Sequence, residues 1–383
     1  MLAITGATVK TITKGTLEGA TVLIEGTKIK EIITCGDIPN GIEKIDAAGK
    51  IITPGLIDVH THLGLMEEGS PVEDASVNEM TDPVTPHMRV VDAINPADPG
   101  FLEAVKGGVT CVQVVPGSAN VVGGQGAVLK TNGQVVDEMI IKSPSGMKVA
   151  FGENPKRVYW QQKKLPSTRM GTAACLRQTL IEAQNYREKM ASTKEKGTEG
   201  FERNLKMEAL LDVLAGKVPL RAHAHRADDI VTAIRIAEEF NLQYTIEHCT
   251  EGDKIAGYLA QKNVRAAVGP TLSSRSKLEL KDMGWHTVVA LNKAGVKTSI
   301  TTDHPVIPVQ YLTINAAMAV RAGLDEDEAL KAITITAAEH LGMEDRLGSI
   351  EPGKDADLVI WSGDPFHYKS RVEMTFIDGK RVV

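Results

Sequence analysis

Histidine and aspartate residues stand at the ends of four separate apolar runs in this chain of 383 residues. They are His60 and His62, His223 and His225, His248, and Asp303. When parallel strands deliver such side chains at their carboxyl ends, the side chains converge on one point. Imidazole and carboxylate ligands with an open coordination position form a hydrolytic metal site. The pattern therefore predicts a metal site that activates water.

The histidine pairs have the spacing that places two ligands side by side. Residues two apart on a strand point to the same face, so His60 and His62 can bind one ion. His223 and His225 share a face for the same reason, and we expect His223, nearer the body of its strand, to be the ligand. Three roles are open for His225: a metal ligand, a substrate contact, or hydrogen bonding at the rim. His248 ends an alternating run and is expected to bind metal.

Asp303 ends the last of these runs and is the candidate general base. A carboxylate in this place can contact a metal ion and accept a proton from the attacking water. This requires hydrogen-bond reach of about 2.6–3.2 Å and a water whose pKa the metal lowers toward ~7. The neighbouring His304 points the other way on a regular strand, so we expect it to have a structural role.

A second ion would need an anionic bridge, and two residues could supply it. Glu153 follows the fourth expected strand and is an oxygen ligand as it stands. Lys148 lies deeper in the same segment and would first have to be carboxylated on its amine. We expect Glu153 to bridge, with Lys148 as the rival and a purely structural Glu153 as a further alternative.

Two arginines in loops at the expected site are candidates for substrate binding. Arg157 follows the fourth expected strand and Arg275 follows the seventh, and either guanidinium could hold a carboxylate. Solvated surface charge is the alternative for each. The glycine cluster at 123–126 offers backbone amides, but such a cluster is more often a turn.

Eight strands are expected to position these residues. Apolar runs alternate with helix-like segments between residues 55 and 344, which is typical of β/α units in a parallel sheet. The expected strands are 56–60, 109–115, 135–141, 147–151, 220–223, 244–247, 265–268 and 297–301. Eight such strands close into an α/β fold, the (β/α)8 TIM-like barrel.

The two ends of the chain have a different pattern. Short alternating runs broken by Gly or Asp fill residues 1–54, and the same texture returns in 345–383. We expect the ends to form a small discontinuous β-sandwich domain beside the barrel domain of 55–344. The long connections 64–99 and 154–219 follow ligand-bearing strands, so we expect them to overhang the site.

Composition and charge limit the classes of partner. Lys and Arg number 43 and Asp and Glu number 49, a net charge of −6 without a basic stripe, so no nucleic-acid partner is expected. No apolar stretch approaches the ~20 residues that span a bilayer. The amino terminus has no export signal, so no membrane partner is expected either. Four separated cysteines fit reduced thiols and favour a cytoplasmic location.

With these residues assembled, the chain resembles the amidohydrolase superfamily, and most of all its imidazolonepropionase-related branch. The resemblance rests on Pro54-Gly-Leu-Ile-Asp-Val-His-Thr-His62, His223, His248, Thr302-Asp303 and Gly348-Ser-Ile-Glu-Pro-Gly-Lys-Asp-Ala-Asp-Leu358, and it spans nearly the whole chain. The metal ligands that it implies are His60, His62, Glu153, His223, His248 and Asp303. It also implies that Asp303 acts as the base and that the enzyme is a homo-oligomer. Arg226 stands where imidazolonepropionases have an acidic residue, shortly after the fifth-strand histidine.

We therefore expect a metal-dependent hydrolase of a carbon–nitrogen bond in an amide, a cyclic amide or a peptide-like small molecule. Zinc is the first expected cation because imidazole-rich sites suit it, with iron or manganese as alternatives and one or two ions per chain. The rival activities on the same site are a prolidase-like dipeptidase and a heterocycle deaminase. The rival of another class is a non-catalytic barrel used as a binding module.

Overall fold

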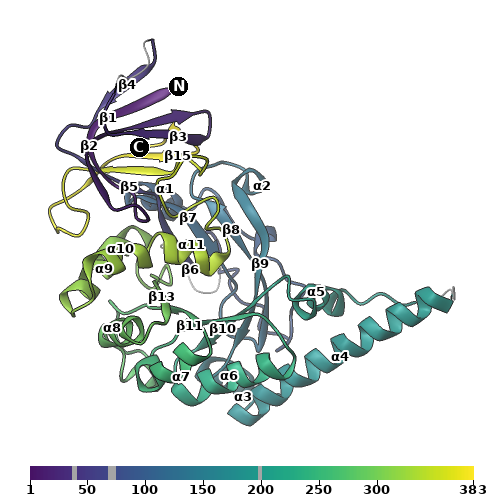
Figure 1. Cartoon of the computed structure of the whole chain (residues 1–383). Helices are drawn as coiled ribbons and strands as arrows, with labels where there is room; N and C mark the ends of the chain where they lie inside the picture. The colour runs from purple at the N-terminus through teal and green to yellow at the C-terminus, as the bar shows by residue number, and fades with distance from the viewer. Residues whose placement is uncertain (37–40, 68–74, 197–200) are drawn as a thin grey trace.

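Two eight-stranded sheets form the framework of the chain in the computed structural model, which describes residues 1–36, 41–67, 75–196 and 201–383. Strands from both ends of the chain build one sheet, and strands between residues 56 and 300 build the other. Figure 1 shows the sheet of the two ends at the top of the molecule, with the second sheet and its helices below it.

The lower unit is a nearly closed barrel sheet that holds the predicted site residues. Its strands follow the order of the chain: β6 (Leu56–Thr61), β7 (Val109–Val114), β8 (Val122–Lys130), β9 (Ile140–Ala150), β10 (Leu220–Ala224), β11 (Tyr244–His248), β12 (Arg265–Val268) and β13 (Lys297–Ile300). The Thr301 hydroxyl donates to the carbonyl oxygen of His60 at 2.8 Å. The backbone N–H of His62 donates to the carbonyl oxygen of His304 at 2.8 Å. The ends of β6 and β13 therefore lie side by side, and the predicted α/β barrel is confirmed.

One of the predicted barrel strands is wrong. Residues Val136–Met139 form the short helix α2, and strand β9 begins only at Ile140, so the segment 135–141 is not a strand of its own. The third strand of the barrel is instead β8, which runs antiparallel to both β7 and β9. The other neighbouring strands of this sheet are parallel. The barrel is thus not built from eight parallel strands.

Glycines allow β8 to pass close to its neighbours. Gly124 has a φ of 129°, and a Cβ there would lie 2.5 Å from the carbonyl oxygen of Met88. A Cβ on Gly126 would lie 2.9 Å from the carbonyl oxygen of Val114. The cluster at 123–126 is therefore part of a strand and not a turn, because the missing side chains permit close backbone contact.

The upper sheet joins the two ends of the chain. Its order is β16 (Lys380–Arg381), β15 (Val372–Ile377), β14 (Leu358–Trp361), β5 (Ile51–Pro54), β1 (Leu2–Lys10), β2 (Thr16–Glu25) and β3 (Lys28–Ile33), and β4 (Glu43–Asp46) pairs with β1. The junction is the antiparallel pairing of β5 with β14, in which Ile52 lies opposite Ile360. Side chains of this sheet, among them Ile4 and Phe376, form an apolar core separate from that of the barrel.

Helices lie in most of the connections between the barrel strands and in the segment that follows β13 (Figure 1). They are α1 (Pro99–Lys106), α2 (Val136–Met139), α3 (Glu153–Gln161), α4 (Arg169–Lys196), α5 (Leu205–Leu214), α6 (Ala227–Glu239), α7 (Ala256–Gln261), α8 (His286–Lys293), α9 (Leu312–Arg321), α10 (Glu326–Ala332) and α11 (Ile335–Leu341), with short 3-10 turns η2 (Val90–Asp92), η3 (Gly252–Ile255), η4 (Leu278–Leu280) and η5 (Val309–Tyr311). Helix α6 buries Ile230, Ala233, Ile234 and Ala237, which lie at helical spacing and pack against the barrel.

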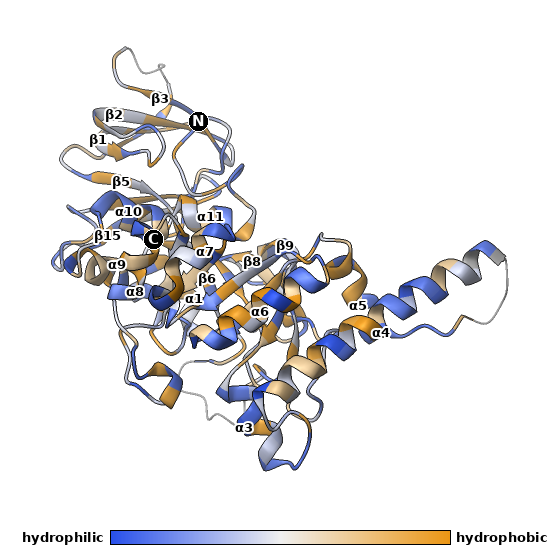
Figure 2. Ribbon diagram, turned by 60° about the horizontal axis from the view of Figure 1, so that its bottom comes forward, coloured by the Kyte–Doolittle hydropathy of each residue, from blue (hydrophilic) through white to orange (hydrophobic). Residues whose placement is uncertain are grey.

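The connection 154–219 is mainly helical in its described part. It contains α4, which extends away from the barrel as an arm with many hydrophilic residues toward its far end (Figures 1 and 2). Only the start of α3 contributes to the site described below, so most of this connection does not overhang it. No helix in the described ranges is both long and apolar enough to cross a membrane.

Candidate metal centre

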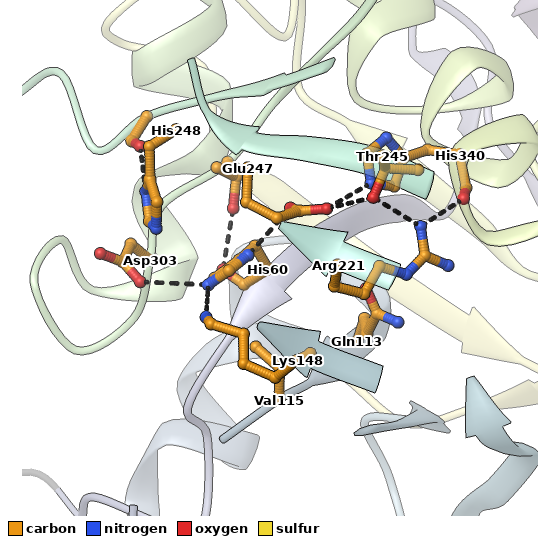
Figure 3. A network of polar contacts seen from close by, with 12 residues as sticks. His60, Gln113, Val115, Lys148, Arg221, Thr245, Glu247, His248, Asp303 and His340 are labelled. Carbon is orange, nitrogen blue, oxygen red and sulfur yellow. Dashed lines mark hydrogen bonds and ion pairs between the residues drawn. The ribbon is translucent and has the colours of Figure 1, made fainter. Parts of the chain in front are cut away.

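The predicted histidines and aspartate form two adjacent groups at the carboxyl ends of barrel strands. The first group is His60, His62 and Asp303, and the second group is His223, His225 and His248. Within each group the candidate ligand atoms lie within 4.8 Å of one another. The ring centroids of His60 and His248 are 4.8 Å apart, so the two groups share one centre (Figure 3).

In the first group, each histidine is held by one ring nitrogen and turns the other toward Asp303. His60 Nδ1 lies 2.9 Å from Glu247 Oε2, and its Nε2 lies 3.7 Å from Asp303 Oδ1. His62 Nδ1 donates to the carbonyl oxygen of Val115 at 2.7 Å, and its Nε2 lies 3.3 Å from Asp303 Oδ1. Metal-binding histidines are oriented in this way, because a hydrogen bond at one nitrogen fixes the tautomer that presents the other.

The second group contains a buried histidine without a hydrogen-bond partner among the described residues. His223 is 3% exposed, and neither of its ring nitrogens has a hydrogen bond there. His248 Nδ1 donates to the carbonyl oxygen of Gly269 at 2.8 Å, and His225 Nδ1 lies 2.8 Å from the Thr250 hydroxyl. A buried imidazole without a partner costs free energy, which a ligand on His223 would recover. Imidazoles with a nearby carboxylate are a donor set that fits a divalent cation.

Burial disfavours the charged form of His60, His223, His225 and His248, and the neutral imidazole is the form that binds metal. Burial, assisted by the charge of Lys148, lowers the pKa of His60 to about 3. Burial also lowers the pKa of His248 to about 4. By itself burial would raise the pKa of Asp303, but the nearby His248, His62 and His60 hold that pKa well below its ordinary value. The carboxylate of Asp303 therefore stays ionised.

Lys148 lies within this centre. Its Nζ is 2.9 Å from His60 Nε2, and its side chain is buried on β9 (Figure 3). Burial lowers the pKa of Lys148 to about 8, although Asp303 and Glu247 favour its charged form. The lowered pKa makes the free amine accessible near neutral pH, and the free amine is the form that can be carboxylated.

Glu153 is not brought into either group. It is the first residue of α3, and its backbone N–H donates to Glu279 Oε2 at 3.0 Å. The chain turns at Gly152, whose φ is 84°, so Glu153 begins a helix and does not continue the strand toward the other ligands. The structure therefore favours Lys148, the rival in the sequence-based expectation, for a place between the two groups.

Glu247 is a site residue that the sequence did not reveal, because regular alternation along β11 would direct it away from the face of His248. Its Oε2 contacts His60, and its Oε1 lies 3.1 Å from His340 Nε2 and accepts from the Thr245 hydroxyl (Figure 3). Burial opposes ionisation of Glu247, but His340 and His60 hold its pKa well below the ordinary value. A φ of 70° at His248 ends the regular alternation, so both neighbours reach the centre.

Asp58 ties the first barrel strand to the turn that carries Asp303. Its carboxylate accepts from the hydroxyls of Thr301 and Thr302 and from the backbone N–H of Thr302. Burial raises the pKa of Asp58 to about 6, against the lowering effect of these threonine contacts. The aspartate in the Asp-x-His-x-His segment thus has a positioning role that its place in the motif did not indicate.

A cavity of about 720 Å³ opens onto both groups. Members of each group line it, His225 included, together with Arg157 on α3. Arg275 does not line this cavity, because its guanidinium donates to the carbonyl oxygens of Lys281 and Met283 at 2.9 Å each. The structure therefore places Arg157 at the wall of this cavity and holds Arg275 within its own loop.

Comparison with known proteins gives the same family from independent information. Residues 51–382 match the amidohydrolase family. A solved structure, of an amidohydrolase from Thermotoga maritima MSB8, is 49% identical, with a TM-score of 0.97 and all of both chains covered. The imidazolonepropionase of Maricaulis maris (strain MCS10) is 26% identical over 91% of this chain and 88% of its own length. Amidohydrolase tasK of Hapsidospora irregularis is 26% identical over 92% of this chain, which spans 38% of that protein.

These matches cover the strands that carry both groups of candidate ligands. The imidazolonepropionase relatives agree with the branch that the sequence motifs indicated. The chain therefore belongs to the amidohydrolase family, in its imidazolonepropionase-related branch, and is a metal-dependent hydrolase of carbon–nitrogen bonds.

Proposed function

We propose that this hydrolase cleaves a carbon–nitrogen bond in an amide, a cyclic amide or a peptide-like small molecule, with Asp303 as the general base. The observation that carries the proposal is His223, a buried imidazole without a hydrogen-bond partner among the described residues, grouped with two further histidines. An ionised carboxylate lies in the adjacent group, and both groups border one cavity. These are the parts that metal-assisted hydrolysis requires.

The proposed ligands are His60, His62 and Asp303 for one divalent cation, and His223 and His248 for a second. His225 either completes the second set or contacts substrate. A carboxylated Lys148 would bridge the two cations, and its contact with His60 supports this role. Glu153 is the weaker candidate for the bridge, because it begins a helix and its backbone N–H donates to Glu279. Zinc is the proposed cation because imidazole-rich sites suit it, with iron and manganese as alternatives, and one filled group would give a one-metal enzyme.

The chain's own residues supply the base and its orientation. Divalent cations bound in such a site act as Lewis acids toward a carbonyl oxygen and lower the pKa of water toward ~7. Asp303, which lines the cavity as an ionised carboxylate, would take the proton of the attacking water and pass it to the departing nitrogen. Glu247 and the carbonyl of Val115 would keep His60 and His62 in the orientation that this transfer needs.

A prolidase-like dipeptidase is the second candidate activity, because Arg157 lines the cavity and a dipeptide carries a carboxylate that a guanidinium could bind. A heterocycle deaminase with a single metal has no need of a bridging group, so the buried amine of Lys148 beside His60 argues against it. A non-catalytic binding module is disfavoured because the predicted histidines and aspartate are all present and grouped.

Metal analysis and hydrolysis assays test the proposal together. After supplementation with zinc, iron or manganese, the protein should hold about one or more equivalents of metal per chain. It should hydrolyse members of a panel of N-acyl amino acids, dipeptides, hydantoin-like rings and imidazolones. Asp303→Asn should lower kcat by about 100- to 10,000-fold, whereas the surface variant Asp282→Asn should not. Less than about half an equivalent of metal, or full activity of Asp303→Asn, would contradict the proposal.

We also propose that residues 1–54 and 345–383 form a discontinuous β-sandwich domain and that 55–344 form the barrel domain. The shared sheet and separate apolar core of the two ends support this division. We further propose that the protein is a cytoplasmic homo-oligomer. It would act on small molecules and have no nucleic-acid partner. The four free cysteines support the location, and the net charge of −6 argues against nucleic acid as a partner.

A further inference from the structure

Two of the three charged residues in the described lining of the cavity are basic. Its charged residues are Asp303, Arg157 on α3, and Lys277 in the segment just before η4. Asp303 belongs to the first group of candidate ligands, so a cation bound to this group would neutralise the negative charge of its carboxylate. A substrate in the cavity therefore lies next to the basic side chains of Arg157 and Lys277, beside the metal centre. These side chains favour an anionic group on the substrate.

A buried carboxylate fixes the position of Lys277. Glu279 has a fully buried side chain, and its Oε1 lies 2.7 Å from Lys277 Nζ. Its Oε2 accepts from the backbone N–H of Glu153, and Gly152 makes room for it, because a Cβ there would lie 2.5 Å from this oxygen. Asn154 Oδ1 lies 3.4 Å from the ammonium. Since an ammonium has three N–H donors, at least one remains for a ligand in the cavity.

Arg157 supplies a charge that no group in the described ranges offsets. It follows Asn154 by one turn of α3 and so lies on the same face of that helix. Asn154 contacts Lys277 and donates to the Ser118 hydroxyl at 2.8 Å. The side chains of Asn154, Arg157 and Lys277 therefore border one part of the cavity. The Arg157 guanidinium has no hydrogen bond or ion pair with any residue in the described ranges. Its planar fork matches a carboxylate.

We propose that Arg157, Lys277 and Asn154 form a carboxylate subsite, and that the substrates are amides with a free carboxylate, such as N-acyl amino acids or dipeptides. The inference rests on the proposed function, because it assumes that the scissile bond lies at the two histidine groups. The same cavity then accommodates the reacting amide at the barrel strands and the carboxylate at the start of α3. Arg157 and Lys277 select and orient the substrate and take no part in breaking the bond.

The first experiment compares substrates that differ only in charge. N-acetyl amino acids and dipeptides are each paired with their carboxamides, and cleavage of the shared amide bond is followed with metal-reconstituted enzyme. We expect kcat/KM to be about 10- to 100-fold higher for the acids. Arg157→Gln should remove most of this preference by raising KM for the acids. Lys156→Gln, one residue earlier on α3 and outside the cavity lining, is the matched control and should keep the preference.

The second experiment measures binding without turnover. Replacing Lys277 alone would leave Glu279 buried without its counter-ion, so the variant used is Lys277→Met combined with Glu279→Gln. Calorimetric titration of the metal-loaded proteins with the same acids and carboxamides gives the dissociation constants. We expect the acids to bind about 10-fold more weakly to this double variant and to Arg157→Gln than to the wild type. The carboxamides should show no such loss.

The two experiments separate the subsite from the reaction. Equal kcat/KM and equal binding for acids and carboxamides would overturn the subsite and leave the proposed hydrolysis intact. Arg157-dependent binding of the acids without cleavage of any pair would support the subsite and count against the proposed function. If neither acids nor carboxamides bind, the subsite is overturned.

Discussion

At the scale of single residues, the metal centre depends on a side chain that does not line the cavity. Glu247 is fully buried, and its two carboxylate oxygens contact His60 and His340. A carboxylate that is hydrogen-bonded to one ring nitrogen of a metal-binding histidine fixes the tautomer of the ring. It also makes the other ring nitrogen a stronger ligand for the metal. Removing this charge should therefore weaken metal binding while every proposed ligand stays in place.

We expect Glu247→Gln to weaken metal affinity about 10- to 100-fold, because an amide cannot replace the carboxylate toward both His60 and His340. Competition with a chelator on the reconstituted protein measures the dissociation constant. Glu239→Gln, which removes a surface partner of Arg177, is the control and should leave the affinity unchanged. Wild-type affinity in Glu247→Gln would mean that the contact with His60 does not support a metal ligand.

At the scale of elements, the apolar runs at 220–223, 244–247 and 265–268 gave correct strands because these strands are largely buried in a parallel part of the sheet. Strand β8 could not be found in this way, since its glycines interrupt the hydrophobic pattern. The grouped histidines were predictable from residue type and the period of a strand, and Lys148 was predicted as the rival of Glu153. The partner Glu247 was not predicted, because its contacts depend on how the backbone turns at strand ends and on which strands become neighbours.

Strand β8 itself gives a prediction about packing. We expect Gly124→Ala to lower the free energy of unfolding by about 2–4 kcal/mol, since its positive φ disfavours a side chain and the Cβ would lie 2.5 Å from the Met88 carbonyl oxygen. Unfolding in denaturant measures the change. Gly257→Ala in α7, where a Cβ meets no atom within 4 Å, is the control and should stabilise by about 0.5–1 kcal/mol. Wild-type stability of Gly124→Ala would mean that β8 does not pass so close to Met88.

At the scale of the whole molecule, a cluster of ion pairs joins the two sheets. Lys130 ends β8 of the barrel, and its Nζ lies 3.0 Å from Asp355 Oδ2 and 2.7 Å from Asp357 Oδ2. It also lies 3.2 Å from Asp378 Oδ1, in the turn between β15 and β16. The Asp355-Ala-Asp357 segment of the sequence motif therefore contacts the barrel and has no part in the metal centre.

Removing the shared cation should destabilise the whole chain. We expect Lys130→Met to lower the free energy of unfolding by about 3–5 kcal/mol at neutral pH, because Asp357 would stay buried without a counter-ion and Asp355 would keep only Lys28 and Arg346. Denaturant unfolding measures the loss. Lys106→Met, which removes an exposed partner of Glu103, is the control and should cost less than about 0.5 kcal/mol. Equal stability of the two variants would show that the cluster does not hold the sheets together.

One carboxylate of this cluster, that of Asp355, gives the stability a dependence on acid pH. Burial opposes ionisation of Asp355, but its contacts with Lys28, Lys130 and Arg346 lower its pKa from 3.8 to about 2. Because the pKa is lower in the folded state, the stabilisation is complete above about pH 4 and disappears as the pH falls through about 2. We expect the Tm of the wild type to fall over this interval, and that of Lys130→Met to fall less, because Asp355 has then lost one of its cations. Parallel Tm profiles for the two proteins would contradict the assignment of this pH dependence to the contact between Lys130 and Asp355.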